Sequence, residues 1–277
     1  MKRVKLVVAY DGTKYCGWQV QDNGITIQGL LNQYLSELLG EDIKTIGASR
    51  TDSGVHALGN VAVFDTNAQM PIEKISFALN AQMPEDIKVQ SSEEVERDFH
   101  PRFRPTIKTY EYRILNRTFA DPTCRLNTFF YYGNLDVEAM KTAASYLVGE
   151  HNFKGFATEN PQTKGTIREI YNATIEKVDD VIKFRITGNG FLYNMVRIIV
   201  GTLLEIGKGS YPPEQVKLIL RKRNRELAGP TARALGLTLI NIEYPPMDIA
   251  EMKKKAEKRW KSAKSIENTE KLVDTQG

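Results

Sequence analysis

The chain has 277 residues, of which 41% are hydrophobic and 26% are charged, as in an ordinary globular protein that needs no staples for its core. Its formal net charge of +4 permits nucleic-acid binding without demanding it. Two cysteines without a C-x-x-C spacing argue against a disulfide framework and favour free thiols in the cytoplasm. No apolar segment approaches the length of a membrane span, so we expect no membrane association.

Apolar periodicity and turn residues predict the elements of the first part of the chain. Residues 4–10 are rich in β-formers and end at a turn signal, which predicts a strand. Residues 27–39 have apolar side chains at helical spacing, with Thr26 as the cap and Gly40 as the terminator. The same rules predict strands over 43–48 and 61–64, a helix over 72–83, and a strand over 87–89.

A second run of strands and helices follows from about residue 108. It comprises a strand over 109–115, a helix over 136–148, a hairpin of 169–178 and 181–187, helices over 191–206 and 213–223, and a strand over 237–243. Because both runs offer elements in comparable order, we predict N-terminal and C-terminal halves over 1–107 and 108–247. Residues 248–277 predict a charged, partly disordered tail, in which a solvated helix is favoured over an RNA-gripping segment.

Asp52 is the most informative acid in the sequence. It lies in a polar loop between two predicted strands, after Arg50 and before Gly54. A carboxylate on a tight, glycine-bearing loop is held by the backbone and can point toward a substrate. Taken alone, the pattern favours an Asx turn that merely stabilises the loop.

Arg197 lies in a helix that is otherwise nearly all apolar. An unpaired buried charge is very costly, so this guanidinium needs a partner, and the carboxylate of Asp52 is a natural one. The alternative is that the side chain of Arg197 extends to solvent along its aliphatic stem.

Aromatic and basic residues gather around the start of the second half. Strand alternation places Tyr110 and Tyr112 on one face, where they could stack a flipped base or belong to the core. The preceding stretch, residues 99–104, interleaves aromatic rings with Arg102 and Arg104, which suits phosphates and stacked bases. The three histidines have no metal-ligand spacing, and nucleotide-cofactor loops are absent, so we expect no metal and no cofactor.

Taken together, the motifs resemble the tRNA pseudouridine synthase A family. They occur in the order YDGT (10–13), GWQ (17–19), SRTDSGVHA (49–57), DFHPRF (98–103), YEY (110–112), GEHNF (149–153), FLYNMVR (191–197) and GPTA (229–232). The string around Asp52 is strongly specific, and the ordered set covers the chain from about residue 5 to residue 245. Ser49 and Ser53 depart from the glycine and alanine that are common in the family.

The resemblance implies an α+β fold: a mixed, largely antiparallel sheet flanked by helices, built from two similar halves with the active cleft between them. It implies a cytoplasmic, homodimeric isomerase without a cofactor that forms pseudouridine at nucleotides 38, 39 and 40 of the tRNA anticodon stem-loop. Asp52 matches the essential aspartate, Arg197 its basic partner, Tyr110 the tyrosine on the target base, and Arg50 an arginine that aids base flipping. We add His56, Arg102 and Arg104 as substrate-binding candidates.

Pseudouridine formation needs an extruded uridine whose glycosidic bond breaks and re-forms through carbon. The sequence leaves open whether Asp52 attacks the nucleotide or removes a sugar proton. Two other functions compete: a nucleic-acid glycosidase, which typically uses two carboxylates, and a non-catalytic RNA-binding paralogue.

Overall fold

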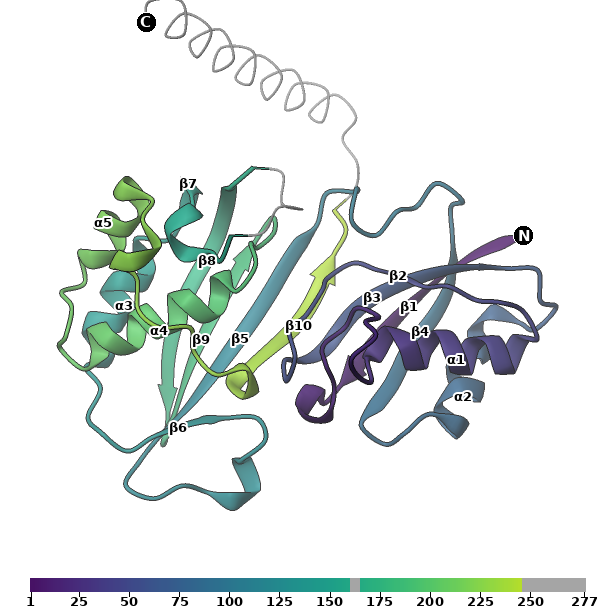
Figure 1. Ribbon diagram of the computed structural model, residues 1–277, viewed down its shortest axis with the longest axis horizontal. Coiled ribbons are helices and arrows are strands. Elements are labelled where there is room, and N and C mark those ends of the chain that lie inside the picture. Colours follow the sequence, from purple (N-terminus) through teal and green to yellow (C-terminus); the bar gives the residue numbers. More distant parts are fainter. Residues whose placement is uncertain (160–164, 246–277) are drawn as a thin grey trace, which may run out of the picture. The chain divides into compact units, whose positions relative to one another are not determined.

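A ten-stranded sheet forms the centre of the described part of the chain (Figure 1). The structure is a computed structural model that describes residues 1–159 and 165–245. The tail predicted over 248–277 lies outside the described residues. Residues Met1–Glu243 form one compact unit. The boundary expected at residue 107 stays a prediction, and the sheet is continuous across it.

The strands are arranged in the order β4-β1-β3-β10-β5-β9-β8-β7. Their bounds are β1 (Lys2–Tyr10), β3 (His56–Thr66), β4 (Ile87–Val95), β5 (Ile107–Asn116), β7 (Gly149–Asn152), β8 (Ile167–Val178), β9 (Val181–Gly188) and β10 (Leu237–Glu243). The short strands β2 (Ile46–Gly47) and β6 (Phe129–Tyr131) pair with β3 and β5. Every pairing is antiparallel except β3 with β10 and β5 with β6. The predicted mixed, largely antiparallel sheet is therefore confirmed.

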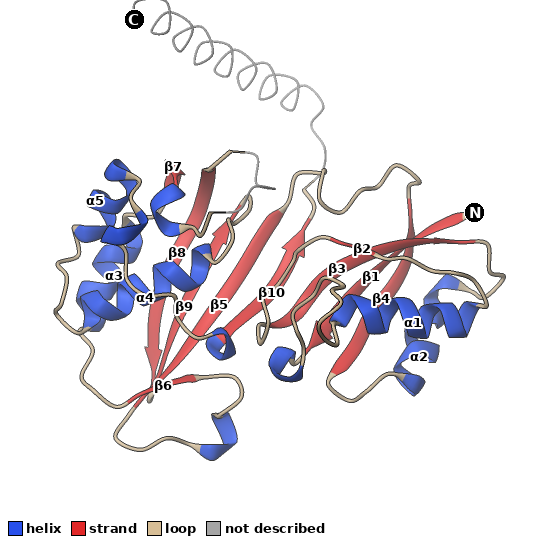
Figure 2. Cartoon of the chain, in the orientation of Figure 1, coloured by secondary structure: helices blue, strands red, loops and turns tan. Residues whose placement is uncertain are grey.

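Five helices accompany the sheet in the described residues (Figure 2). They are α1 (Ile27–Leu39), α2 (Ile72–Gln82), α3 (Val137–Ser145), α4 (Met195–Gly207) and α5 (Gln215–Lys222). In the N-terminal part α1 packs on α2 and α2 on β4, whereas in the C-terminal part α3 packs on both α4 and β8. None of these helices is long and apolar enough to cross a membrane. The predicted α+β class is confirmed.

The helix α1 follows its sequence signals closely. The Oγ1 atom of Thr26 accepts a hydrogen bond from the backbone N–H of Gly29, and Gly40 ends the helix in the left-handed region, at a φ of 67°. Ile27, Leu31 and Leu35 are fully buried, so the apolar stripe faces the core as its spacing predicts.

Several predicted elements are shorter in the structure, and local chemistry explains two of the differences. The strand predicted over 43–48 pairs only at Ile46–Gly47, because side chains of α1 occupy the preceding backbone donors: Asn32 Oδ1 accepts from Thr45 N and Ser36 Oγ from Ile43 N. The helix predicted from residue 191 begins at Met195, because Asn194 adopts a φ of 58° and interrupts the helical backbone. Arg197 therefore lies in the first turn of α4.

Candidate active site

Asp52 lies on the loop that joins β2 to β3. Its backbone carbonyl accepts a hydrogen bond from Val55 N, and the carbonyl of Thr51 accepts one from Trp18 N. Gly54 turns the chain with a φ of 76°, a value that side chains disfavour. The loop main chain is therefore pinned on both sides of the aspartate, while 21% of the Asp52 side chain remains exposed.

A buried network of polar side chains holds this loop in place. The Nδ2 atom of Asn60, a residue with no exposed surface, donates to the hydroxyl of Tyr10 at 3.1 Å and to the carbonyl of Ser49 at 3.0 Å. The Tyr10 hydroxyl lies 2.7 Å from Thr51 Oγ1. Buried polar groups without partners are costly, so these bonds specify one conformation of the loop around Arg50. The sequence analysis missed this network.

Arg197 is fixed by three hydrogen bonds at the start of α4. Its Nη1 donates to Asp52 Oδ2 at 3.0 Å and to Asn194 Oδ1 at 3.1 Å, and its Nε donates to the carbonyl of Ala232 at 2.8 Å. The pairing expected between Arg197 and Asp52 is thus formed, across 145 positions of sequence. Because the guanidinium is held from several directions, it orients the carboxylate as well as neutralising its charge.

Tyr110 on β5 lies close to this ion pair. Its hydroxyl is 2.9 Å from Ser49 Oγ, and the ring of Phe191 meets its ring edge-on at a centroid distance of 5.2 Å. Burial raises the pKa of Tyr110 to about 12, the hydrogen bond with Ser49 lowers it, and the negative charge of Asp52 raises it. Tyr112 is fully buried and donates to the carbonyl of Arg233, so it belongs to the core.

His56 is buried and engaged on both sides of its ring. Its Nδ1 accepts from Gly12 N at 3.1 Å, and its Nε2 lies 3.1 Å from the carbonyl of Leu235. The same Nδ1 lies 3.1 Å from Oδ1 of Asp11. The ring thus links β3 to the segment that leads into β10. The assignment of His56 to substrate binding stays a prediction.

The basic residues of the 99–104 stretch have different surroundings. Arg104 pairs with Glu96 at 2.5 Å and Asp98 at 3.1 Å, and its guanidinium lies 4.8 Å from the centroid of the Phe99 ring. Partial burial lowers the pKa of Arg102, and the nearby charge of Arg50 lowers it further. Arg102 and Arg50 are thus brought together beside the Asp52 loop, whereas Arg104 is held by carboxylates.

Lys108 is a further cation of this region that the sequence analysis did not single out. It lies two residues before Tyr110 on β5, and its Nζ donates to the carbonyl of Ala48 at 3.0 Å. Strand alternation places residues 108 and 110 on the same face, so the signal was present in the sequence. Burial lowers the pKa of Lys108 to about 8, and the charges of Arg102 and Arg168 contribute.

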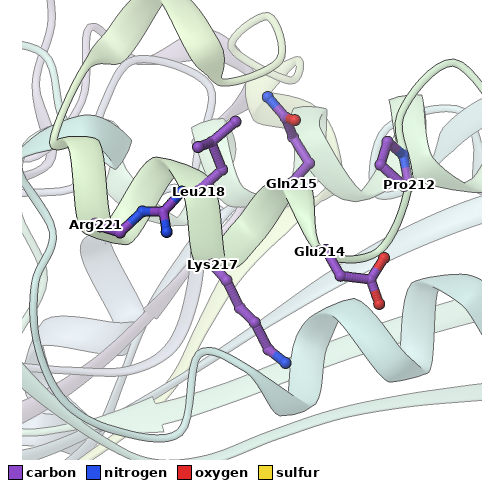
Figure 3. Close-up of a pocket in the computed structure, with 6 residues that line it drawn as sticks. All are labelled: Pro212, Glu214, Gln215, Lys217, Leu218 and Arg221. Carbon is purple, nitrogen blue, oxygen red and sulfur yellow. The ribbon is translucent and has the colours of Figure 1, made fainter.

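A surface hollow of about 360 Å³ also lies on α5 and the turn before it (Figure 3). Its lining consists of Pro212, Glu214, Gln215, Lys217, Leu218 and Arg221. No candidate site residue contributes to it. Among the described residues, no group of three or more His, Cys, Asp or Glu side chains is placed to hold a metal ion.

The chemistry available at Asp52 follows from this geometry. A carboxylate that is partly open to solvent and held by a guanidinium can act as a nucleophile or as a base toward a bound molecule. Next to this carboxylate, the ring of Tyr110 packs edge-on against that of Phe191, so aromatic side chains adjoin the ion pair.

Comparison with known proteins adds to this geometry. A family model described as tRNA pseudouridine synthase matches residues 6–104 and 143–245. Curated relatives called tRNA pseudouridine synthase A cover 88% of this chain and 100% of their own length: those of Thermoanaerobacter sp. strain X514 at 48% identity, and of Acetivibrio thermocellus and Brevibacillus brevis at 45%. A crystal structure of the archaeal box H/ACA sRNP Nop10-Cbf5 complex matches 85% of this chain and 46% of that one, at 11% identity. Its TM-score of 0.32 supports no conclusion.

Proposed function

Because this chain belongs to the tRNA pseudouridine synthase A family, we propose that Asp52, Arg197 and Tyr110 carry out its reaction on tRNA. The enzyme is an isomerase that converts uridine to pseudouridine in tRNA. The bond between N1 of the base and C1′ of the ribose breaks, and a bond between C5 and C1′ forms. C5 loses a proton and N1 gains one, so atoms and electrons balance without a redox partner.

Asp52 starts this reaction, either by nucleophilic attack on the nucleotide or by removal of a sugar proton. Arg197 holds the carboxylate in the orientation that the reaction needs. The observation that carries the proposal is the 3.0 Å contact between Arg197 Nη1 and Asp52 Oδ2 on a side chain that still reaches solvent. A positioned carboxylate gains rate because the reacting groups are already aligned.

Tyr110 receives the target base after it leaves the RNA stack. Extrusion of a base costs roughly a few kcal/mol. Stacking against aromatic rings and contacts of Arg50 and Arg102 with phosphates offset that cost. The hydroxyl of Tyr110 assists the removal of the C5 proton at the end of the reaction.

We propose that the substrate site is the anticodon stem-loop, at nucleotides 38, 39 and 40, as the resemblance implies. The same resemblance implies a cytoplasmic homodimer. Sedimentation of the purified chain with and without a tRNA transcript tests the dimer, and a monomer at micromolar concentration would contradict it.

The function is tested by incubating the purified chain with unmodified tRNA transcripts and mapping pseudouridine at single-nucleotide resolution. We expect pseudouridine with the wild type and none with Asp52→Asn, which keeps its affinity for tRNA. The matched control is Asp65→Asn, because Asp65 also pairs with an arginine, Arg3, at 2.6 Å on another part of the sheet. Release of free uracil would instead identify a glycosidase, and binding without any change in the RNA would identify a non-catalytic paralogue.

A further inference from the structure

Three cations converge next to Tyr110, and the reaction described above gives a role to only one of them. Lys108 lies on β5, Arg102 lies in the loop before it, and Arg168 lies near the start of β8. Burial lowers the pKa of Lys108 to about 8, and the charges of Arg102 and then Arg168 lower it further. Both positive charges therefore act on the ammonium of Lys108 in the free protein.

A hydrogen bond and a close approach connect two of these cations to the surroundings of Tyr110. The ammonium of Lys108 donates to the carbonyl of Ala48, whose neighbour Ser49 bonds the Tyr110 hydroxyl. Arg168 runs alongside Gly190, where an added Cβ would lie 3.7 Å from its Nε, and the next residue, Phe191, meets the Tyr110 ring. The Nη1 atom of Arg168 donates to the carbonyls of Gly165 and Ile167, at 3.3 and 2.6 Å. Lys108 and Arg168 each therefore contact a residue whose chain neighbour touches the Tyr110 side chain.

We propose that Lys108, Arg168 and Arg102 form a binding site for one phosphodiester group of the RNA, next to the uridine that stacks on Tyr110. This inference rests on the proposed function and adds a ligand and a residue set to the same site. An ammonium can donate three hydrogen bonds. Among the described residues, the ammonium of Lys108 donates one, to the carbonyl of Ala48. Two donors remain for an anion.

The physical reason for such a site is mutual repulsion among the cations. Holding three positive side chains close together is unfavourable in the free protein, and an anion placed among them removes that cost. A flipped nucleotide leaves its backbone phosphate at the mouth of the pocket that receives its base. The phosphate then fixes the position of the ribose relative to Asp52.

The first test measures affinity for a tRNA transcript with Lys108→Met and Lys108→Arg. We expect Lys108→Met to weaken binding about tenfold and to reduce the salt dependence by roughly one counterion, because one charge-assisted contact is lost. Lys177→Met is the matched control, since Lys177 lies at the opposite end of β8 from Arg168. Its affinity and salt dependence should equal those of the wild type.

The dependence of binding on pH separates a phosphate contact from a merely structural role. Burial, and then the charges of Arg102 and Arg168, lower the pKa of Lys108 to about 8, so in the free protein its charge is lost as the pH rises through this value. We therefore expect the wild-type affinity to fall by about five- to tenfold between pH 7.5 and 9. With Lys108→Arg the affinity should be high and nearly constant, because a guanidinium stays charged.

A chemical test locates the phosphate without depending on how a variant folds. Stem-loop RNAs that each have one neutral methylphosphonate near the target uridine are titrated against wild type and Lys108→Met. We expect one position at which neutralisation weakens binding to the wild type about tenfold but hardly affects the variant. Additive effects at every position, or equal salt dependence in the two proteins, would overturn the inference.

The two proposals fail in different ways. If the wild type forms no pseudouridine, the proposed function is wrong. If it forms pseudouridine, but methylphosphonate effects are the same in the wild type and Lys108→Met, only the phosphate site falls. Competition by inorganic phosphate against the stem-loop distinguishes a general anion site from an RNA site, because an RNA site resists millimolar phosphate.

Discussion

Asp52 and Arg197 meet at one point, yet the two regions that supply them are built differently. The Asp52 loop is held by a few buried hydrogen bonds, from Asn60 to Tyr10 and to the Ser49 carbonyl. Arg197 lies on α4, where eleven of the thirteen residues are buried. The loop is stabilised by a few particular polar atoms, whereas the helix is stabilised by many apolar contacts that each contribute a little.

The close fit of α4 to its neighbouring segment illustrates the second arrangement. A Cβ added at Gly201 would collide with the backbone of Pro230, and Gly229 N donates to Thr202 Oγ1 at 2.9 Å. The backbone of Ala232 in turn donates to the carbonyl of Arg197. Contacts of this kind are redundant. We therefore expect the loss of a single contact to leave Arg197 in place, whereas a similar loss near the loop would displace Asp52.

The largest expected effect comes from breaking the link between the two regions. Arg197→Met should lower turnover by about a hundredfold or more, with little change in KM, because the carboxylate loses its orientation. Steady-state pseudouridine formation measures this. The control is Arg185→Met, which removes an exposed guanidinium 2.7 Å from Glu111 Oε2, a buried carboxylate that keeps Arg113 as its second partner. Turnover of Arg197→Met within about threefold of the wild type would contradict the assigned role.

The next effect compares the two kinds of support directly. Asn60→Ala should lower the free energy of unfolding by about 2–3 kcal/mol and turnover by about tenfold, because buried partners lose their bonds and the loop shifts. Ile198→Val on α4 should cost about 1 kcal/mol of unfolding free energy and leave turnover unchanged. Urea denaturation and kinetics on the same samples measure both. Equal effects on turnover would remove the distinction.

A smaller effect is expected at the contact between the loop and β5. Ser49→Ala removes the hydrogen bond to the Tyr110 hydroxyl and should lower turnover by roughly threefold, with a stability loss near 1 kcal/mol. In a Tyr110→Phe background, Ser49→Ala should lower turnover no further, because the partner hydroxyl is already absent. Fully additive losses would show that the two hydroxyls act separately.

The smallest effect concerns the alkaline range. Burial raises the pKa of Tyr110 from 10 to about 12, so the unfolded chain loses this proton first as the pH rises. The contribution of Tyr110 to stability is complete below pH 10 and is lost as the pH approaches 12. Between pH 9.5 and 11, the wild type should lose about 1 kcal/mol more unfolding free energy than Tyr110→Phe. Parallel pH curves would contradict the burial of this phenol.

Local signals predicted the elements, and one physical rule predicted the central contact. Thr26, Gly40 and the apolar stripe between them define α1 within the sequence itself. The pair of Arg197 and Asp52 was predictable because an arginine in an apolar helix needs a partner, and Asp52 was the best-placed carboxylate. The roles assigned to these residues in catalysis stay proposals.

The features that the sequence analysis missed depend on contacts between distant segments. Asn60 interrupts an apolar strand, but nothing local indicates that its partners are Tyr10 and the Ser49 carbonyl. Nothing local distinguishes Lys108 from an ordinary strand lysine, because its burial and the charges that act on it come from distant segments. The start of α4 was placed four residues early, because apolar periodicity continues through Asn194 although the backbone does not.

The position of β10 has a consequence for how the enzyme is made. This strand lies between β3 and β5, parallel to the first at Thr238 and His56 and antiparallel to the second at Leu237 and Tyr112. During translation its residues leave the ribosome long after those of β3 and β5. An incomplete copy that stops before residue 237 has the aspartate and the arginine but lacks the strand that lies between β3 and β5 in the sheet. We therefore expect chains that end before β10 to be inactive.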